Sequence, residues 1–167
     1  GGYGMRRHDE VEEIYYTYSD DVYYYLLSMT RNEVIAEDML QATFLQVMNG
    51  IATFRGRCSL KTWIFTIARH EYFHWTKKNP PMLQLDEEVP LHDKMIDSYE
   101  KREQVSKILK YIDNLEEPHR SLMVFRLIND LTFREIAIIL GKTESWARVT
   151  FMRDKHKLLE DLKEELE

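Results

Sequence analysis

Apolar residues recur at three- and four-residue spacing along almost the whole chain, and the alternation typical of β-strands is nearly absent. This spacing places apolar side chains on one side of an α-helix. In the first such segment, residues 8–29, the apolar and tyrosine positions at this spacing are Val11, Ile14, Tyr15, Tyr18, Val22, Tyr25, Leu26 and Met29. The periodicity therefore predicts an all-α fold.

Helix start and stop signals divide the rest of the chain. Gly50 is a natural C-terminal stop, Ser59 is a predicted N-cap, and Pro118 stands at a first-turn position. Thr132 and Glu135 have the spacing of a capping box. With these signals, the predicted helices cover residues 33–49, 59–78, 99–114, 118–129, 132–141 and 143–167.

Residues 79–99 separate these helices into two groups. The segment contains prolines, clustered acids and little periodicity, which is typical of a linker. We predict two small helical domains, residues 5–78 and 100–167, joined by this acidic linker, and no internal repeat. No signal peptide is visible, and Gly1 to Gly4, ahead of Met5, are set aside as an expression remnant.

The single cysteine, Cys58, excludes an internal disulfide and a cysteine-rich metal site, and it fits a reducing compartment. The apolar fraction of 44% is enough for a packed core. No apolar run approaches the roughly 20 residues that span a bilayer. We therefore expect a soluble cytoplasmic protein without membrane insertion.

The net charge of −6 hides a strong segregation of charge. Residues 55–78 hold six Lys or Arg against one acid, a local charge of +5, and residues 142–157 hold five against two, a local +3. Between them, residues 79–100 hold one lysine against six acids, a local −5. Two basic stretches on predicted helices indicate two surfaces for nucleic acid.

The C-terminal stretch has the spacing of a helix-turn-helix. Ala137 stands where two helices must approach closely, Gly141 follows at the turn, and Thr143 starts the next helix at once. In this motif the second helix enters the DNA major groove. At 100° per residue, Ala147, Phe151, Leu158 and Leu162 fall on the core side, and Ser145, Arg148, Val149, Met152, Arg153 and His156 fall opposite.

The types of residue on that opposite side suit base recognition. Arg148 and Arg153 can make bidentate contacts to guanine, and Val149 and Met152 can touch thymine methyl groups. Three lysines, Lys142, Lys155 and Lys157, are better placed for phosphates. The alternative is a solvated face on an ordinary bundle helix; two apolar residues inside the face favour DNA.

The helix predicted after Ser59 also carries two distinct faces. Its apolar stripe is Leu60, Ile64, Ile67, Ala68 and Trp75, with Glu71 projecting into the middle. The adjoining face is Trp63, Thr66, His70, Phe73, His74 and Lys77. Aromatic rings interleaved with cations suit single-stranded DNA, because rings stack on bases while cations follow the backbone.

Three segments, AEDMLQATFLQVM (36–48), FRGRCSLKTWIFTIAR (54–69) and LEEPHRSLMVFRLINDLTFREIAIILG (115–141), resemble the extracytoplasmic-function sigma factors of bacterial RNA polymerase. The resemblance runs in order from about Glu10 to Leu162. It implies a non-enzymatic protein without cofactors that binds core RNA polymerase and promoter DNA. Further partners that it implies are an anti-sigma factor and, within the polymerase, the β′ clamp helices and the β flap.

The resemblance also implies roles for particular residues. The segment with Asp38, Gln41 and Phe44 resembles the part that docks on the β′ clamp helices. The residues that match the part that captures and melts the −10 element are Arg55, Arg57, Ser59, Lys61, Trp63 and His70. The residues that match the −35 helix are Arg148, Val149, Met152 and Arg153. The linker resembles the segment that threads towards the polymerase active centre.

The chain departs from the family pattern at four positions. The family commonly has an acid where Ala42 stands and an asparagine where His70 stands. In the recognition helix, Trp146 replaces a small residue and Ala147 a usual valine. These last two departures leave the −35 sequence unpredicted.

One motif favours a different class of protein. His70-Glu71-Tyr72-Phe73-His74 matches the H-E-x-x-H pattern of zinc peptidases. Such a site also needs a third protein ligand, and Glu87 and Glu88 follow two prolines in the acidic linker. We expect no metal site, and ordinary surface histidines at positions 70 and 74. A free-standing helix-turn-helix regulator is the other alternative.

Overall fold

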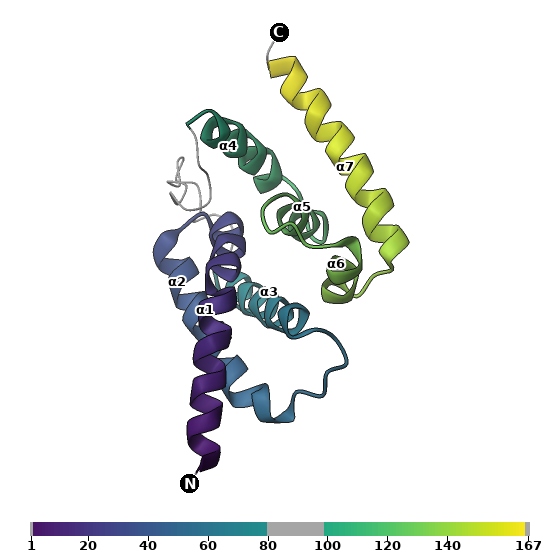
Figure 1. Ribbon diagram of the computed structural model, residues 1–167. Coiled ribbons are helices and arrows are strands. Elements are labelled where there is room, and N and C mark those ends of the chain that lie inside the picture. The colour runs from purple at the N-terminus through teal and green to yellow at the C-terminus, as the bar shows by residue number, and fades with distance from the viewer. Residues whose placement is uncertain (1, 80–98, 166–167) are drawn as a thin grey trace. The chain divides into compact units, whose positions relative to one another are not determined.

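In this computed structural model the described backbone comprises residues 2–79 and 99–165, and every regular element in it is helical. The first group of helices is α1 (Gly2–Thr30), α2 (Glu33–Gly50), the 3-10 turn η1 (Ile51–Thr53) and α3 (Leu60–Lys78). The second group is α4 (Tyr99–Asp113), α5 (His119–Leu127), α6 (Phe133–Leu140) and α7 (Glu144–Glu165) (Figure 1). The all-α prediction is confirmed.

Within the described residues, two helix boundaries differ by more than one residue from those predicted. Helix α1 begins at Gly2 rather than at residue 8, so residues 2–4, which we set aside in the sequence, continue the helix. Helix α5 ends at Leu127 rather than near residue 129. The predicted linker from Pro80 to Asp97 and the predicted N-cap Ser98 lie outside the described residues.

The chain forms two compact units, residues 1–87 and 88–167. In the first unit α1, α2 and α3 all pack on one another. A left-handed Arg31 (φ 57°) turns the chain between α1 and α2, and the side chain of Asn32 then accepts a hydrogen bond from the backbone N–H of Ile35. Fully buried side chains from all three helices fill the centre, namely Val22, Tyr25, Leu26, Met29, Ala36, Val47, Ile64, Phe65 and Ala68.

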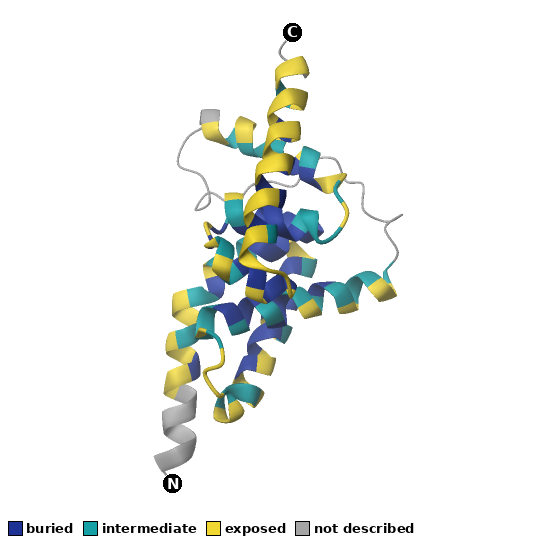
Figure 2. Cartoon of the chain, turned by 90° about the vertical axis from the view of Figure 1, so that its right-hand side faces the viewer, coloured by how far each residue is buried: buried dark blue, intermediate teal, exposed yellow. Residues whose placement is uncertain are grey.

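In the second unit α5, α6 and α7 pack on one another, and α4 packs on α5 and α7. The buried core residues include Leu109, Ile112, Leu122, Met123, Phe125, Ile136 and Ala147. Figure 2 shows this burial as dark blue on the inner sides of the helices and yellow on their outer sides. Within residues 2–79 and 99–165, no helix is long and apolar enough to cross a membrane.

Gly50 is needed for a reason other than the predicted one. Its φ of −100° is right-handed, so it does not end α2 by the left-handed conformation that glycine favours. Instead, a Cβ atom at this position would lie 3.0 Å from Cζ2 of Trp63. The glycine therefore allows the indole ring of α3 to pack directly on the end of α2.

The apolar stripe of α3 is partly as predicted. Ile64, Ile67 and Ala68 are buried, whereas Leu60 and Trp75 are only half-buried. The pattern missed three buried residues, which are Thr62, Phe65 and Tyr72. Glu71 does not enter the core: it is half-buried and its Oε1 accepts a hydrogen bond from Nε2 of Gln46 on α2.

Candidate nucleic-acid interface

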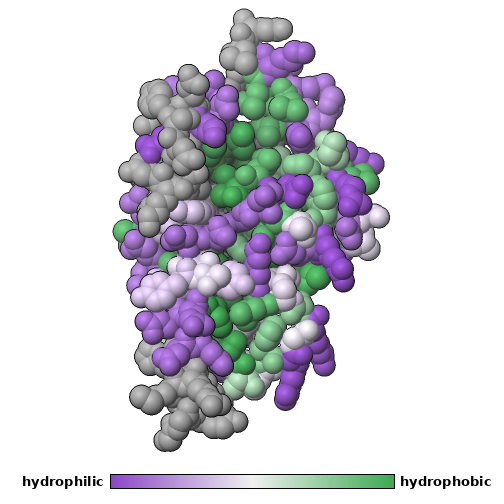
Figure 3. Space-filling model, in the orientation of Figure 1, coloured by the Kyte–Doolittle hydropathy of each residue, from purple (hydrophilic) through white to green (hydrophobic). Residues whose placement is uncertain are grey.

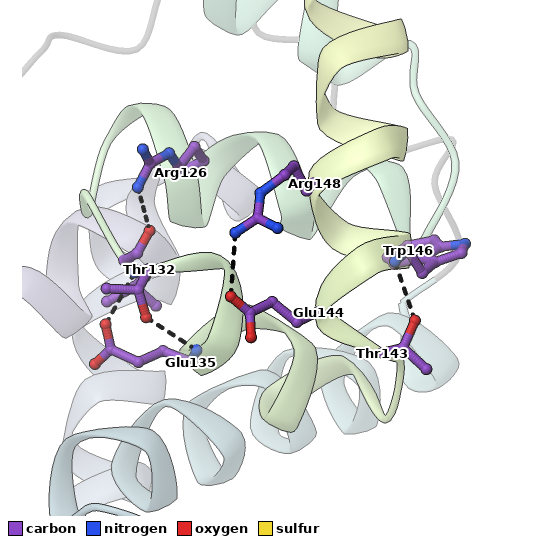
Figure 4. Close-up of polar contacts among 8 residues, drawn as sticks. Arg126, Thr132, Glu135, Thr143, Glu144, Trp146 and Arg148 are labelled. Carbon is purple, nitrogen blue, oxygen red and sulfur yellow. Dashed lines mark hydrogen bonds and ion pairs between the residues drawn. The ribbon is translucent and has the colours of Figure 1, made fainter.

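The connection between α6 and α7 is fixed by local hydrogen bonds. Thr132 Oγ1 accepts from the N–H of Glu135 at 3.1 Å, and Glu135 Oε1 accepts from the N–H of Thr132 at 2.9 Å, which completes the predicted capping box. Gly141 adopts a left-handed conformation with φ 68°. Thr143 Oγ1 then accepts from the N–H of Trp146 at 3.0 Å (Figure 4). These contacts hold α6 and α7 as a helix-turn-helix.

Helix α7 has the two sides that the sequence predicts. Ala147, Phe151 and Leu158 are buried, and Leu162 is half-buried. The opposite residues, which we name the exposed row, are all exposed: Ser145, Arg148, Val149, Met152, Arg153 and His156. Its two apolar members, Val149 and Met152, are 49% and 56% exposed. The row therefore combines accessible cations with accessible apolar groups.

Two polar residues on the buried side were not predicted. Thr150 and Asp154 are buried between the apolar positions of α7. Oδ2 of Asp154 lies 2.6 Å from Nδ1 of His119 at the start of α5. No local pattern could identify this pair, because its members are 35 residues apart.

Arg148 lies at the edge of the exposed row, where α7 meets the start of α6. Its Nη2 atom is 3.1 Å from Oε1 of Glu144, one helical turn earlier (Figure 4). Its guanidinium carbon is 5.5 Å from the centre of the Phe133 ring. Neither Glu144 nor Phe133 was identified as a functional residue from the sequence.

The predicted phosphate-binding lysines are exposed, as are the flanking residues of the turn. Lys142 Nζ is 5.3 Å from the centre of the Trp146 ring, and that ring is 6.3 Å from the imidazole of His119. Trp146 therefore lies beside the exposed row, near the start of α5. Lys155 and Lys157 lie further along α7.

The residues predicted to contact the −10 element occupy three different environments. Arg55 and Arg57 are exposed in the connection between η1 and α3, and His70 is exposed on α3. Ser59 is the N-cap of α3, because its Oγ accepts from the N–H of Thr62 at 3.1 Å. The hydroxyl of Ser59 therefore has a structural role already.

Lys61 is half-buried, next to an acid of α1. The pKa of Asp21 is raised, because burial of its carboxyl group outweighs the opposing effect of the Lys61 charge. The charges of Asp21 on α1 and Lys61 on α3 therefore attract each other where the two helices meet. Lys61 therefore has less freedom to reach a phosphate than Arg55 or Arg57.

Trp63 is half-buried, and its ring contacts residues on both sides of η1. Its ring is stacked on Phe54, with the ring centres 4.8 Å apart and the planes 27° apart. Another part of the ring packs on Gly50. A base that stacks on Trp63 must therefore use the part of the indole that these two residues leave open.

The H-E-x-x-H motif has no partner that would make it a zinc site in the described chain. His70 and His74 are exposed on α3, and the intervening Glu71 is hydrogen-bonded to Gln46. Among the residues that the structure describes, no three His, Cys, Asp or Glu side chains could together hold a metal ion. Glu87 and Glu88 lie outside the described residues.

A groove of about 480 Å³ runs between α1 and α2 in the first unit. It is lined by Val11, Glu12, Tyr15, Tyr16, Gln41, Phe44, Leu45 and Met48, and we name it the α1–α2 groove. Of the predicted docking residues, Gln41 and Asp38 are exposed, whereas Phe44 is buried with its ring 5.0 Å from that of Tyr15. The sequence signal that was missed is the pair of exposed apolar residues, Leu45 and Met48.

The second unit has an apolar groove of about 750 Å³ between α4 and the end of α7. It is lined by Glu103, Gln104, Lys107, Ile108, Leu159, Leu162 and Lys163, and we name it the α4–α7 groove. Figure 3 shows the hydrophobic surface of this part of the unit in green. Neither groove is lined by a residue of the exposed row.

Comparison with known proteins finds similarity to sigma factors of RNA polymerase. The Sigma-70 region 2 family matches residues 14–79, which include α2, α3 and most of α1. RNA polymerase sigma factor YlaC of Bacillus subtilis (strain 168) is 29% identical to the chain, over 95% of each protein. ECF RNA polymerase sigma factor SigX of the same organism is 30% identical, over 92% of this chain and 85% of its own length.

Two solved structures have the same fold. CnrH, in complex with the cytosolic domain of CnrY, superposes on 93% of this chain with a TM-score of 0.73 and 15% identity, over 89% of its own chain. The sigma factor RpoE of Bartonella quintana, in complex with the anti-sigma factor NepR, superposes on 92% with a TM-score of 0.74 and 19% identity, over 97% of its own chain.

The Sigma-70 region 2 match lies in the first unit, and the helix-turn-helix lies in the second. The relatives extend this match over nearly the whole chain. The chain belongs to the family of ECF RNA polymerase sigma factors.

Proposed function

We propose that this protein binds core RNA polymerase in the cytoplasm and directs it to specific promoters, with no catalysis of its own. The observation that carries the proposal is the exposed row of α7, held on a helix-turn-helix within a chain of the ECF sigma factor family. The H-E-x-x-H motif gives no support to a hydrolase, because in the part of the chain that the structure describes it has no third side chain with which to hold a metal ion.

Within the proposed function, the exposed row recognises the −35 element. Arg148 and Arg153 supply bidentate donors for guanine, and Val149 and Met152 supply apolar contacts for thymine. Lys142, Lys155 and Lys157 hold the DNA backbone, which sets the position of the helix without selecting a sequence. All seven residues are exposed, which supports these roles.

Within the proposed function, the first unit captures and opens the −10 element through residues of α3 and of the connection that precedes it. Arg55 and Arg57 attract the phosphates, and His70 offers a hydrogen-bonding group on the same unit. The exposed part of Trp63 stacks on an unpaired base, a contact worth about 1–3 kcal/mol. Lys61 and Ser59 contribute mainly by holding α3, since Ser59 caps it and Lys61 lies beside Asp21.

Each of the two grooves binds a different part of RNA polymerase. The α1–α2 groove accepts the β′ clamp helices, with Gln41, Leu45 and Met48 in contact and Asp38 at the exposed side of the same helix. The α4–α7 groove accepts an apolar element of the β flap. An anti-sigma factor of the kind bound to RpoE competes for these surfaces.

Transcription in vitro tests the function directly. The protein and core polymerase together are expected to start transcripts at specific promoters, and neither component alone is expected to do so. The same protein without polymerase is expected to bind promoter DNA poorly at physiological salt, because its two basic stretches are short. Tight sequence-specific binding by the free protein, with no co-purifying polymerase, would instead support the free-standing regulator.

A further inference from the structure

The guanidinium of Arg148 is held by two side chains that are not themselves members of the exposed row. Glu144 accepts a hydrogen bond from Nη2 at 3.1 Å, and the Phe133 ring centre lies 5.5 Å from the guanidinium carbon. Glu144 is on the same helix one turn earlier, and Phe133 is the first residue of α6. The arginine is therefore held from two directions, one within α7 and one across the helix-turn-helix.

Phe133 is itself fixed, so it can act as a support. Its ring lies 5.5 Å from that of Phe151, which is buried in the core side of α7. A second guanidinium, that of Arg126 on α5, lies 4.5 Å from the same ring. Arg126 is in turn fixed, because its Nη1 donates to the carbonyl oxygen of Leu131 at 2.9 Å (Figure 4).

This arrangement has a consequence for recognition. A free arginine side chain loses rotamer freedom when it binds a base, whereas one that is already held has lost that freedom before binding. A carboxylate beside the DNA also repels phosphates, so Glu144 does not favour binding to DNA of arbitrary sequence. The lost rotamer freedom favours the base that makes the bidentate contact, so it increases the difference in affinity between the correct base and a wrong one. The repulsion of phosphates lowers affinity for every sequence and leaves that difference unchanged.

We infer that Glu144 and Phe133 are positioning residues that hold Arg148 in the orientation with which it recognises one base pair of the −35 element. The inference rests on the proposed function, because it assigns these residues a role only if Arg148 contacts the promoter. Glu144 contributes through its hydrogen bond to Arg148, and Phe133 contributes through the face of its ring.

The expected effects are set by the strength of each contact. Arg148→Ala should reduce discrimination at its base pair by about 5- to 150-fold, the range for a bidentate contact. Glu144→Gln should reduce it by about twofold, since exposed pairs at this helical spacing are weak. Phe133→Leu, which keeps apolar volume against Phe151, should reduce it by about two- to fivefold.

The experiment measures competition between promoters with each of the four bases at every −35 position, using polymerase reconstituted with each variant. The variants are Arg148→Ala, Glu144→Gln, Phe133→Leu and the double variant Glu144→Gln/Arg148→Ala. The control is Asp161→Asn, since Asp161 is also an exposed acid of α7 and lies outside the exposed row. Thermal melting of each variant establishes that folding is unchanged.

The inference is supported if Glu144→Gln weakens the base preference lost in Arg148→Ala, and has no further effect once Arg148 is absent. It is overturned if Arg148→Ala changes the base preference and Glu144→Gln does not. It is also overturned if Glu144→Gln changes the base preference equally in the presence and in the absence of Arg148. In either case the proposed function still stands. If Arg148→Ala changes no −35 preference, the assignment of Arg148 is wrong and the inference is overturned with it.

Discussion

The Nδ1 atom of His119 lies 2.6 Å from Oδ2 of Asp154, and the carboxylate of Asp154 is only 8% exposed. His119 is the first residue of α5, and Asp154 lies on the buried side of α7. The pair therefore joins the helix that carries the exposed row to the helix behind it. A buried acceptor without a partner is costly, so this contact matters for how firmly α7 is held.

Asp154→Ala is expected to lower the free energy of unfolding of the second unit by about 1.5–3 kcal/mol, the usual range for a hydrogen bond to a charged group. Asp154→Asn should lower it less, since the amide keeps an acceptor for His119. Chemical denaturation followed by circular dichroism measures both. Asp161→Asn, at an exposed position of α7, is the control, and an equal loss in that variant would contradict the role of the pair.

Gly50→Val is expected to destabilise the first unit by about 1–3 kcal/mol, as overpacking of a close contact does. The reason is that a Cβ atom would lie 3.0 Å from Cζ2 and 3.3 Å from Cη2 of Trp63. Urea denaturation measures the loss. In a Trp63→Ala background the loss should be smaller, and an unchanged loss would mean that the contact with Trp63 is not its cause.

Trp63→Ala is expected to impair opening of the −10 region more than initial promoter binding, because the ring is needed to stack on an unpaired base. Since the same ring packs on Phe54, Trp63→Phe is the variant that retains an aromatic face with less disturbance. Permanganate reactivity of −10 thymines measures opening. Full reactivity in a folded Trp63→Ala protein would exclude the stacking role.

Leu45→Arg is expected to weaken binding to core polymerase by about 2 kcal/mol or more, the scale of an important interface residue. Its side chain is 58% exposed in the α1–α2 groove, so the change should leave folding intact. Val34→Arg is the matched control, because Val34 is 68% exposed on the same helix and does not line the groove. Equal binding of polymerase by the two variants would argue against the groove.

His70→Asn and His74→Gln are expected to support polymerase-dependent transcription well, since both side chains are exposed. Glu71→Gln should cost only a little stability, because Gln46 loses a charged acceptor. Metal analysis of the purified protein should find no stoichiometric zinc. One tightly held zinc per chain, lost together with activity in His70→Asn, would favour the hydrolase instead.

Local signals in the sequence were sufficient for the helix-turn-helix. The capping box at Thr132, the left-handed Gly141 and the Thr143 cap each depend on residues within a few positions. For the same reason the exposed side of α7 could be predicted from helical spacing alone. The start of α3 after its N-cap Ser59 and its end at Lys78 also depend on residues within a few positions.

Contacts between distant segments could not be predicted in this way. The packing of Trp63 on Gly50 joins two helices, and His119 and Asp154 are 35 residues apart. Helix α2 shows a further difficulty, since apolar residues such as Leu45 and Met48 lie on its outer side while Phe44 and Val47 are buried. Periodicity assigns sides poorly to a helix whose exposed side carries apolar residues among its polar ones.

The capping contacts at Thr132 and Thr143 hold α6 and α7 in place without using Val149, Met152 or Arg153. Those three side chains belong neither to the core nor to any cap, and they are exposed. Their identities can therefore change with little effect on folding. A library randomised at these positions should yield folded proteins with new promoter preferences. Such proteins would serve as a starting scaffold for transcription circuits that do not act on the host's own promoters.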